Sequence, residues 1–453
     1  MKRKIAEVLL LICSIAFLIS CKSKPLTPDT ALQAYLENGD RTFKWEVRDT
    51  YDEEGMAWYR ILFTSQQWRG IEWKHEMAVI VPDDLEYNDA LIFIQGGSLK
   101  DGEPNTHDFK KSLVVQLSQV AVTNKSIVAA LWQVPNQPLY DDLTEDALIS
   151  YTLHNYLNDL DFTWPLLFPM TKSAVRAMDV VQQFGRKELK RKIDQFILTG
   201  ASKRGWTTWL AGANDKRVKA IAPMVIDVLN MPVNVDYQKV VWGDYSPEIQ
   251  DYVKLGIAQQ IGTPGGDDLV QMIDPYSYRN TLTMPKMIFM GTNDPYWPVD
   301  AVKNYIDSIP GDNHICYIPN AGHDLGDGMK AFATLSAFLG ITVTDGKYSV
   351  CDYSVSEEAG EIEIKVRSSP DTCLDAIFWS AVSEDQDFRD ETWADSVLNP
   401  ADKTDIRVKI KKPQTGYKAF YVDLLHKAPF GEDYTQSTRM YVTDSVKLLL
   451  RAN

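Results

Sequence analysis

The chain is poor in cysteine, basic residues are outnumbered by acidic ones, and no apolar run has the length that a membrane-spanning helix requires. Five cysteines occur in 453 residues, and none of their spacings resembles a zinc site. The formal net charge of −15 argues against binding to nucleic acid or to an anionic lipid surface through bulk charge. There is no internal repeat and no long low-complexity tract. What remains is typical of a large globular protein, and 45% hydrophobic residues suffice for a sizeable core.

The N-terminus has the pattern of an export signal. A basic start precedes an apolar run from Val8 to Ile19, which is too short to span a bilayer. The run ends in Leu18-Ile19-Ser20-Cys21, which resembles a lipobox. We therefore expect residues 1–20 to be removed and Cys21 to carry a lipid. That lipid would anchor the protein in the cell envelope of a two-membraned bacterium, at the outer membrane or facing the periplasm. The alternatives are an ordinary signal peptide or an uncleaved anchor.

Three cysteines remain in the body of the chain. Cys351 and Cys373 could form a disulfide within one small domain outside the cytoplasm, while Cys316 lies in an apolar, strand-like run. The alternative is three reduced and buried thiols. The sequence favours neither.

Up to about residue 342 the pattern alternates between short apolar runs and helical segments. This alternation is typical of an α/β fold with a mostly parallel sheet flanked by helices. Strands are expected at Trp58–Thr64, Glu76–Val81, Ala90–Ile94, Ser126–Leu131, Gln195–Leu198, Val218–Val225, Lys286–Met290 and His314–Ile318. Helices are expected at Thr144–Leu157, Ser173–Phe184, Arg204–Ala213, Ala301–Ile309 and Met329–Leu339.

Changes in composition divide the chain further. Residues 21–29 are polar and contain proline, so they are expected to form a tether before a domain at 30–342. Residues 228–280 interrupt the alternation of strands and helices and are expected to form a cap inserted between two strands. Residues 345–453 show the alternating pattern of a separate small β-sandwich.

A strand that runs into Gly200-Ala201-Ser202, followed at once by a helical segment, has the pattern of a nucleophile elbow. In such an elbow a small residue two positions before the serine allows a sharp turn, and the helix N-terminus favours developing negative charge. The second glycine of the usual Gly-x-Ser-x-Gly is displaced, because Arg204 takes its place and Gly205 follows. The alternative is a serine that merely caps a helix.

Two further residues follow Ser202 in the order that this fold requires. Asp294 comes after the strand ending at Met290, and His323 comes after the strand ending at Ile318. Loops after parallel strands meet at the same edge of a sheet, so we expect a triad in which Ser202 attacks, His323 moves the proton and Asp294 orients the imidazole. Separately, each of the two could be an ordinary loop residue.

Supporting residues are assigned from the same logic. The backbone N–H of Lys203 and that of Gly97, in the Gly96-Gly97 turn after a strand, are the expected oxyanion hole. Asp227 is the alternative acid, since it follows a neighbouring strand. Arg204 is expected to form a structural ion pair under the elbow, although Lys203 and Arg204 could also attract an anionic substrate.

Several long motifs carry a family resemblance. They are Thr64–His75, Gly200–Trp209, Trp242–Ser246, Gly291–Asp294 with Pro298–Asp300, and Pro319–His323. The chain resembles the PhoPQ-activated pathogenicity-related proteins, which implies an α/β-hydrolase fold and makes the displaced glycine a family trait. A Phe-rich segment that the family has after the acid is replaced by Pro295-Tyr296-Trp297, which is expected to alter the wall of the substrate site. The resemblance brings no substrate.

We therefore expect a serine hydrolase that cleaves an ester or an amide of a small molecule or peptide, with no metal and no organic cofactor. The competing hypothesis is a non-catalytic binding lipoprotein on a hydrolase scaffold. Composition and motifs leave the oligomeric state open.

Overall fold

The computed structural model describes residues 26–451, apart from 112 and 359. The predicted export signal, Cys21 and most of the predicted tether lie outside these residues. Within them, no helix combines the length and the apolar character needed to cross a membrane. Helix α2 (Pro28–Leu36) begins inside the segment expected to be tether, and its proline stands at the first helical position, where a missing N–H costs nothing.

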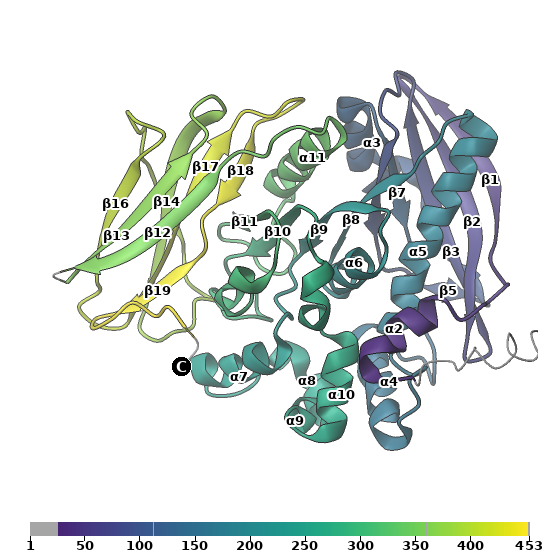
Figure 1. Ribbon diagram of the computed structural model, residues 1–453, viewed down its shortest axis with the longest axis horizontal. Helices are drawn as coiled ribbons and strands as arrows, with labels where there is room; N and C mark the ends of the chain where they lie inside the picture. The colour runs from purple at the N-terminus through teal and green to yellow at the C-terminus, as the bar shows by residue number, and fades with distance from the viewer. Residues whose placement is uncertain (1–25, 112, 359, 452–453) are drawn as a thin grey trace, which may run out of the picture.

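A large sheet organises the molecule, in the order β1-β2-β3-β7-β4-β8-β9-β10-β11 (Figure 1). The first three strands and β7 pair antiparallel, and from β7 to β11 all neighbours are parallel. The strands are β1 (Lys44–Glu53), β2 (Met56–Trp68), β3 (Ile71–Pro82), β4 (Asp89–Ile94), β7 (Ile127–Leu131), β8 (Gln195–Ala201), β9 (Val218–Met224), β10 (Lys286–Gly291) and β11 (Asn313–Ile318). A two-stranded hairpin, β5 (Leu99–Lys100) and β6 (Glu103–Pro104), lies beside it.

Helices cover both faces of this sheet, which explains why its central strands are apolar throughout. In β4, Ala90, Ile92 and Ile94 pack into one core cluster, while Leu91 and Phe93 pack into the cluster on the other face. The covering helices are α3 (Leu113–Asn124), α5 (Leu167–Phe184), α6 (Lys203–Asn214) and α11 (Met329–Val343), with a 3-10 turn η1 (Phe109–Lys111) and a π-helical turn η2 (Gly185–Leu189). Helix α4 (Glu145–Asp159) packs instead against the short helices between β9 and β10. This is the α/β-hydrolase fold that the sequence predicted.

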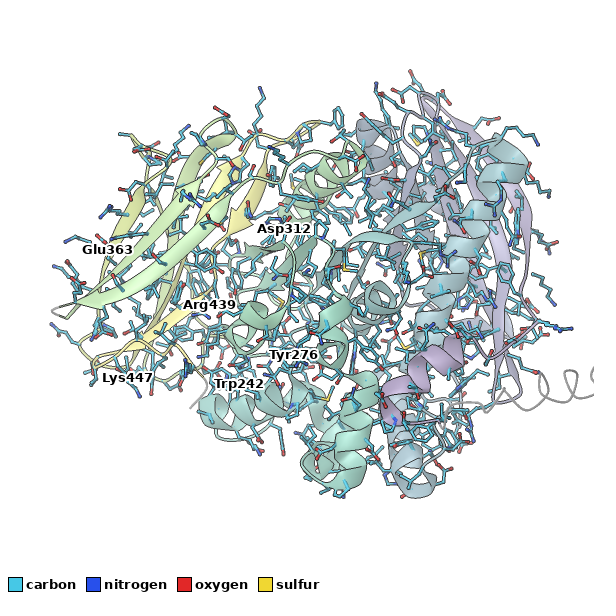
Figure 2. All side chains as sticks on the ribbon, viewed as in Figure 1. Trp242, Tyr276, Asp312, Glu363, Arg439 and Lys447 are labelled. Atoms are coloured by element: carbon cyan, nitrogen blue, oxygen red, sulfur yellow. The ribbon has the colours of Figure 1, made fainter. Side chains whose placement is uncertain are left out.

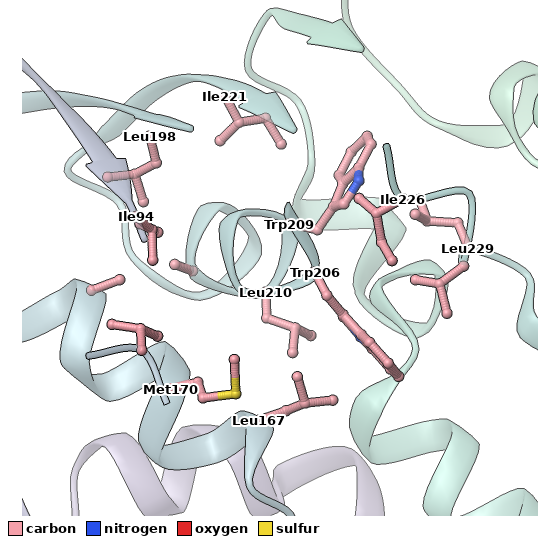
Figure 3. Close-up of a cluster of buried hydrophobic side chains, with 14 of the residues drawn as sticks. Ile94, Leu167, Met170, Leu198, Trp206, Trp209, Leu210, Ile221, Ile226 and Leu229 are labelled. Carbon is pink, nitrogen blue, oxygen red and sulfur yellow. The ribbon is translucent and has the colours of Figure 1, made fainter. Parts of the chain in front are cut away.

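The helix that carries the elbow is held from both sides. Figure 3 shows Leu210 of α6 between Leu198 and Ile221 of the sheet and the α5 residues Leu167 and Met170, while Trp209 of α6 lies toward Ile226. These side chains are buried. The position of the segment after Ser202 is thus set by core packing.

One predicted helix is replaced by two turns. Instead of a helix over Ala301–Ile309, the structure has η5 (Ala301–Asn304) and η6 (Ile306–Ser308). Tyr305, between them, leaves the helical region at φ −142°. Its hydroxyl donates to Oδ1 of Asp227 at 2.5 Å, so a tertiary contact interrupts the local helical pattern.

The segment between β9 and β10 consists of short helices that lie together at one end of the sheet (Figure 1). They are α7 (Met231–Trp242), η3 (Pro247–Ile249), α8 (Gln250–Lys254), α9 (Ile257–Gln260), α10 (Pro264–Ile273) and η4 (Pro275–Thr281). This is the segment for which the sequence predicted a cap.

The C-terminal strands form two layers, but they are not separate from the main sheet. One layer is β12 (Cys351–Glu358), β13 (Glu361–Ser368) and β16 (Ile406–Lys411). The other layer continues the large sheet, because β18 pairs with β11 at Ser437 and Ile315. An edge strand that would otherwise leave its backbone groups unpaired is covered in this way. The second layer contains β14 (Cys373–Ser383), β15 (Ala394–Val397), β17 (Tyr417–His426), β18 (Tyr434–Ser437) and β19 (Tyr441–Asp444).

The possible disulfide between Cys351 and Cys373 is not formed. Both residues, and Cys316, are free thiols. Cys351 and Cys373 belong to different layers, where both contribute to the apolar core between the layers. Burial raises the pKa of the Cys351 thiol and raises that of Cys316 to about 11, so the reactive thiolate is disfavoured at both positions.

The seam between the two parts of the sheet allows a test of stability. Tyr421 of β17 packs against Tyr317 of β11, with ring centroids 5.0 Å apart, and its buried hydroxyl has no hydrogen-bond partner among the described residues. Tyr421→Ala should lower the free energy of unfolding by about 3 kcal/mol or more, because it leaves a cavity. Tyr421→Phe should leave it unchanged or raise it, because it removes an unpaired polar group. Denaturant unfolding measures both free energies. A large loss of unfolding free energy in Tyr421→Phe would contradict the absence of a hydrogen bond to the Tyr421 hydroxyl.

Candidate active site

Ser202 stands in a strained turn between β8 and α6. Its backbone has φ +58° and ψ −126°, a region that non-glycine residues rarely adopt. The turn is fastened by two backbone hydrogen bonds, from Ser202 N to Met224 O at 2.9 Å and from Trp206 N to Ser202 O at 3.0 Å. The first bond ties the turn to β9 and the second begins α6. The serine is therefore held at the edge of the sheet.

Two glycines make this turn possible. A Cβ at Gly200 would lie 2.9 Å from the Cβ and the carbonyl oxygen of Arg204. A Cβ at Gly205 would lie 2.6 Å from Cγ2 of Ile226 and 2.9 Å from the carbonyl oxygen of Met224. Position 205 is thus where α6 crosses the end of β9, which explains why the second glycine stands one residue later than usual.

Arg204 stands at the position where the usual motif has its second glycine. Its guanidinium donates to both carboxylate oxygens of Glu145, at 2.7 and 2.6 Å, and to the carbonyl of Val134 at 2.6 Å. A Cβ at Gly96 would lie 2.5 Å from this guanidinium. Burial alone would raise the pKa of Glu145, but the bonds and charges of Arg204 and Lys203 outweigh it and lower the pKa to about 2. Arg204 is thus an ion-paired brace beneath the elbow.

His323 and Asp294 are in direct contact. Nδ1 of His323 lies 2.8 Å from Oδ2 of Asp294, and since a carboxylate only accepts hydrogen bonds, Nδ1 carries the proton. Asp294 is 3% exposed, and its other oxygen accepts the backbone N–H of Tyr296 at 2.8 Å. The Tyr296 ring covers the imidazole, with centroids 4.2 Å apart. The imidazole is thus fixed in orientation and in tautomer, and its Nε2 is available as a base.

Ser202 and His323 line the same pocket, although the structure contains no hydrogen bond between Oγ and Nε2. Nε2 is buried and has no partner among the described residues. Catalytic hydrogen bonds between nucleophile and base are often long without substrate and shorten in the reacting complex. Ser202 and His323 therefore line one cavity, and Asp294 lies behind the imidazole, so that one of the two contacts of the predicted triad is formed.

Asp227, the alternative acid, does not reach the imidazole. It is 2% exposed and accepts the hydroxyl of Tyr305. Burial, helped by the charges of Asp294 and Asp300, raises its pKa to about 7. A carboxyl group with so raised a pKa is only partly ionised near neutral pH, and its contact is with Tyr305 and not with the imidazole.

The predicted oxyanion donors have different surroundings. Lys203 is the first residue of α6 and lines the pocket, and its Nζ lies 3.0 Å from both Glu145 Oε2 and Asp146 Oδ2. Gly97 has φ +139° and its carbonyl accepts from Gln137, but it is not among the residues that line the pocket. The assignment of Gly97 to the oxyanion hole stays a prediction.

The pocket is a small apolar cavity of about 80 Å³. Its polar lining includes Asp146, to which Tyr252 of α8 donates a hydrogen bond at 2.9 Å. Sequence reasoning gave neither residue a role, because an acidic residue in the first turn of a helix is ordinary. The apolar lining consists of Trp206, Ile226, Val228, Met231, Val235, Ile249, Ile257, Ala258, Ile261 and Trp297.

No group of three or more acidic, histidine or cysteine side chains among residues 26–111, 113–358 and 360–451 is placed to hold a metal ion.

The chain is similar to several known proteins. It is 29% identical over 442 residues to the autocrine proliferation repressor protein A of Dictyostelium discoideum, covering 90% of this chain and 88% of that protein. Among solved structures, acetyl xylan esterase 1 from Thermoanaerobacterium sp. shares 16% identity with a TM-score of 0.44, over 70% of this chain and 94% of that one. An S-formylglutathione hydrolase from Agrobacterium tumefaciens shares 10% identity with a TM-score of 0.42, over 66% of this chain and 99% of that one.

The resemblance seen in the motifs is confirmed by a family model. The model, described as PhoPQ-activated pathogenicity-related protein, matches residues 32–389, which is most of the chain. The protein therefore belongs to the family of PhoPQ-activated pathogenicity-related proteins.

Proposed function

We propose that the protein is a serine hydrolase that cleaves an ester or amide through an acyl-enzyme on Ser202. The observation that carries this proposal is the contact between His323 Nδ1 and Asp294 Oδ2, because His323 lines the same pocket as Ser202, the serine of a strained elbow. A strained backbone persists only where its surroundings hold it, and strained residues concentrate at functional sites.

The roles follow from this geometry. Ser202 Oγ attacks the acyl carbon while Nε2 of His323 takes its proton, and Asp294 stabilises the imidazolium. The N–H groups at the start of α6 stabilise the oxyanion. The imidazolium then returns the proton to the leaving alcohol or amine, and a water molecule, deprotonated by Nε2, releases the acid from Ser202. The sequence of steps consumes one water and regenerates the hydroxyl.

The cavity favours a short, apolar acyl group. Its lining is mostly aliphatic and aromatic, and the cap helices α7–α9 supply much of it. A volume of about 80 Å³ leaves little room for a long chain without movement of the cap.

The first test is covalent labelling of the nucleophile. A fluorophosphonate probe should tag the wild-type protein and should not tag Ser202→Ala, because the probe reports an activated serine. Hydrolysis of short acyl esters and aminoacyl amides should fall by on the order of 10⁶-fold in that variant. A folded wild-type protein that is neither tagged nor active would favour the binding-protein hypothesis.

The second test decides which carboxylate is the acid. Asp294→Asn should lower kcat by about 10⁴-fold, because the amide no longer favours the correct tautomer. Asp227→Asn should cost less than about tenfold, since the Asp227 carboxyl contacts Tyr305 and not His323. Steady-state kinetics measures both, and the reverse order would refute the assignment of Asp294.

The pH dependence of the stability of Asp227→Asn tests the ionisation of Asp227 without an activity assay. The folded state raises the pKa of Asp227 from 3.8 to about 7, so wild-type stability is lost as the pH rises through this interval. An amide does not ionise, and the difference in unfolding free energy, variant minus wild type, should increase from about pH 4 to about pH 7. A flat difference would show that Asp227 is ionised throughout.

We also propose that a lipid on Cys21 anchors this site in the cell envelope, as supported by the lipobox-like Leu18-Ile19-Ser20-Cys21. Cys21→Ser in a chain exported by a cleavable signal without a lipobox should move the protein from the membrane fraction to the soluble fraction, with its hydrolase activity unchanged. Fractionation with activity assays checks this, and membrane association of that cleaved variant would exclude the lipid as the anchor.

A further inference from the structure

The loop that carries Asp294 is held by the C-terminal strands. Nδ2 of Asn293, the residue before the acid, lies within hydrogen-bond distance of three carbonyl oxygens, those of Phe388 (3.3 Å), Arg389 (3.0 Å) and Glu391 (2.8 Å). All three belong to the loop of residues 384–393, between β14 and β15. The Asn293 side chain thus contacts three backbone carbonyl groups from a distant part of the chain.

The loop that carries His323 is held by the same segment. Nδ2 of Asn320 donates to the carbonyl of Trp393 at 3.0 Å, and Oδ1 of Asn320 accepts the N–H of Trp393 at 2.7 Å. This reciprocal pair of hydrogen bonds resembles the backbone pairing between two neighbouring β-strands. Asn320 adopts φ +56°, so its backbone is also set for this contact.

The two anchored loops are also joined to each other. Oγ1 of Thr292 accepts the N–H of Asn320 at 2.9 Å and donates to Oδ1 of Asn293 at 2.7 Å. A Cβ at Gly291 would overlap the carbonyl oxygens of Ala321 and Gly322, so the two backbones are in close contact. A shift of either loop would therefore move the other.

The 384–393 loop has a rigid base. Phe388 and Trp393 are each 2% exposed and pack into the main core cluster. The loop also reaches the cap, because Gln386 donates to the hydroxyl of Tyr237 at 2.9 Å and the Arg389 guanidinium lies 4.2 Å from the centroid of the Trp242 ring. Figure 2 shows Trp242 at the end of α7 that is nearer the C-terminal strands.

We propose that the 384–393 loop is a positioning element of the active site: through Asn293 and Asn320 it fixes the loops that carry Asp294 and His323. This role rests on the proposed hydrolase function, and it assigns the C-terminal strands a part in the geometry of the site. Neither asparagine contacts the pocket, so both act through the residues that they hold.

The test uses two variants of the full-length protein. Asn293→Ala removes the amide that faces the three carbonyls, and Asn320→Gly removes the other side chain while still allowing its positive φ. Each should lower kcat for a short acyl ester by roughly 10- to 100-fold with little change in KM, because misplacement of catalytic groups affects the chemical step. Each should also broaden or abolish the low-field proton NMR resonance of Nδ1–H of His323 in its hydrogen bond to Asp294.

Two matched controls separate positioning from stability. Asn124→Ala removes a buried amide that donates to Val120 and Ser336, between α3 and α11, and Asn399→Gly makes the glycine substitution at another positive φ, 43°, on the exposed surface. Both should keep kcat and the low-field resonance, whatever their melting temperatures. The resonance itself is identified by its loss in His323→Ala.

The outcomes distinguish this proposal from the proposed function. Wild-type levels of kcat and an unchanged resonance in Asn293→Ala and Asn320→Gly would overturn the positioning role. Equal losses of kcat in the controls would also overturn it, because the effect would then follow stability alone. If the wild-type protein has no hydrolase activity, the proposed function fails, and the resonance in the four asparagine variants still decides whether the loop positions His323.

Discussion

The turn at Ser202 constrains everything around it. A serine at φ +58° between a buried strand and a buried helix persists only if its neighbours leave no alternative. Gly200 and Gly205 allow the backbones of β8, α6 and β9 to come into contact, and Arg204 braces the turn from below through Glu145. The same packing places Lys203, the first residue of α6, in the lining of the cavity.

A second set of contacts extends this order to the end of the chain. The pairing of β11 with β18 joins the C-terminal strands to the large sheet, and the core cluster beside α5 and α6 also contains Phe388, Trp393 and Tyr421. A sandwich attached by a flexible linker would not impose geometry on the loops after β10 and β11. A continuous sheet restrains these loops, because displacement of its C-terminal half would break backbone pairing as well as the contacts of Asn293 and Asn320.

Short-range patterns predicted much of this molecule. The apolar runs at β4, β7, β8, β10 and β11 were recognisable because strands buried on both faces need continuous hydrophobic sequence. Ser202, Asp294 and His323 were predicted as a triad because each follows such a strand, and parallel strands bring their following loops to one edge. The exceptions are informative. The helix expected over Ala301–Ile309 is broken by the bond from Tyr305 to Asp227, a partner that local sequence does not reveal.

What the sequence determined by itself was therefore the fold class, the family and the order of the three candidate catalytic residues, since these depend on periodicity and on motifs read along the chain. Only the tertiary structure decided which carboxylate contacts the imidazole, that Cys351 and Cys373 remain free thiols, and that the C-terminal strands belong to the large sheet. Each of these depends on distances between residues far apart in the chain, and such distances result from packing that no local pattern contains.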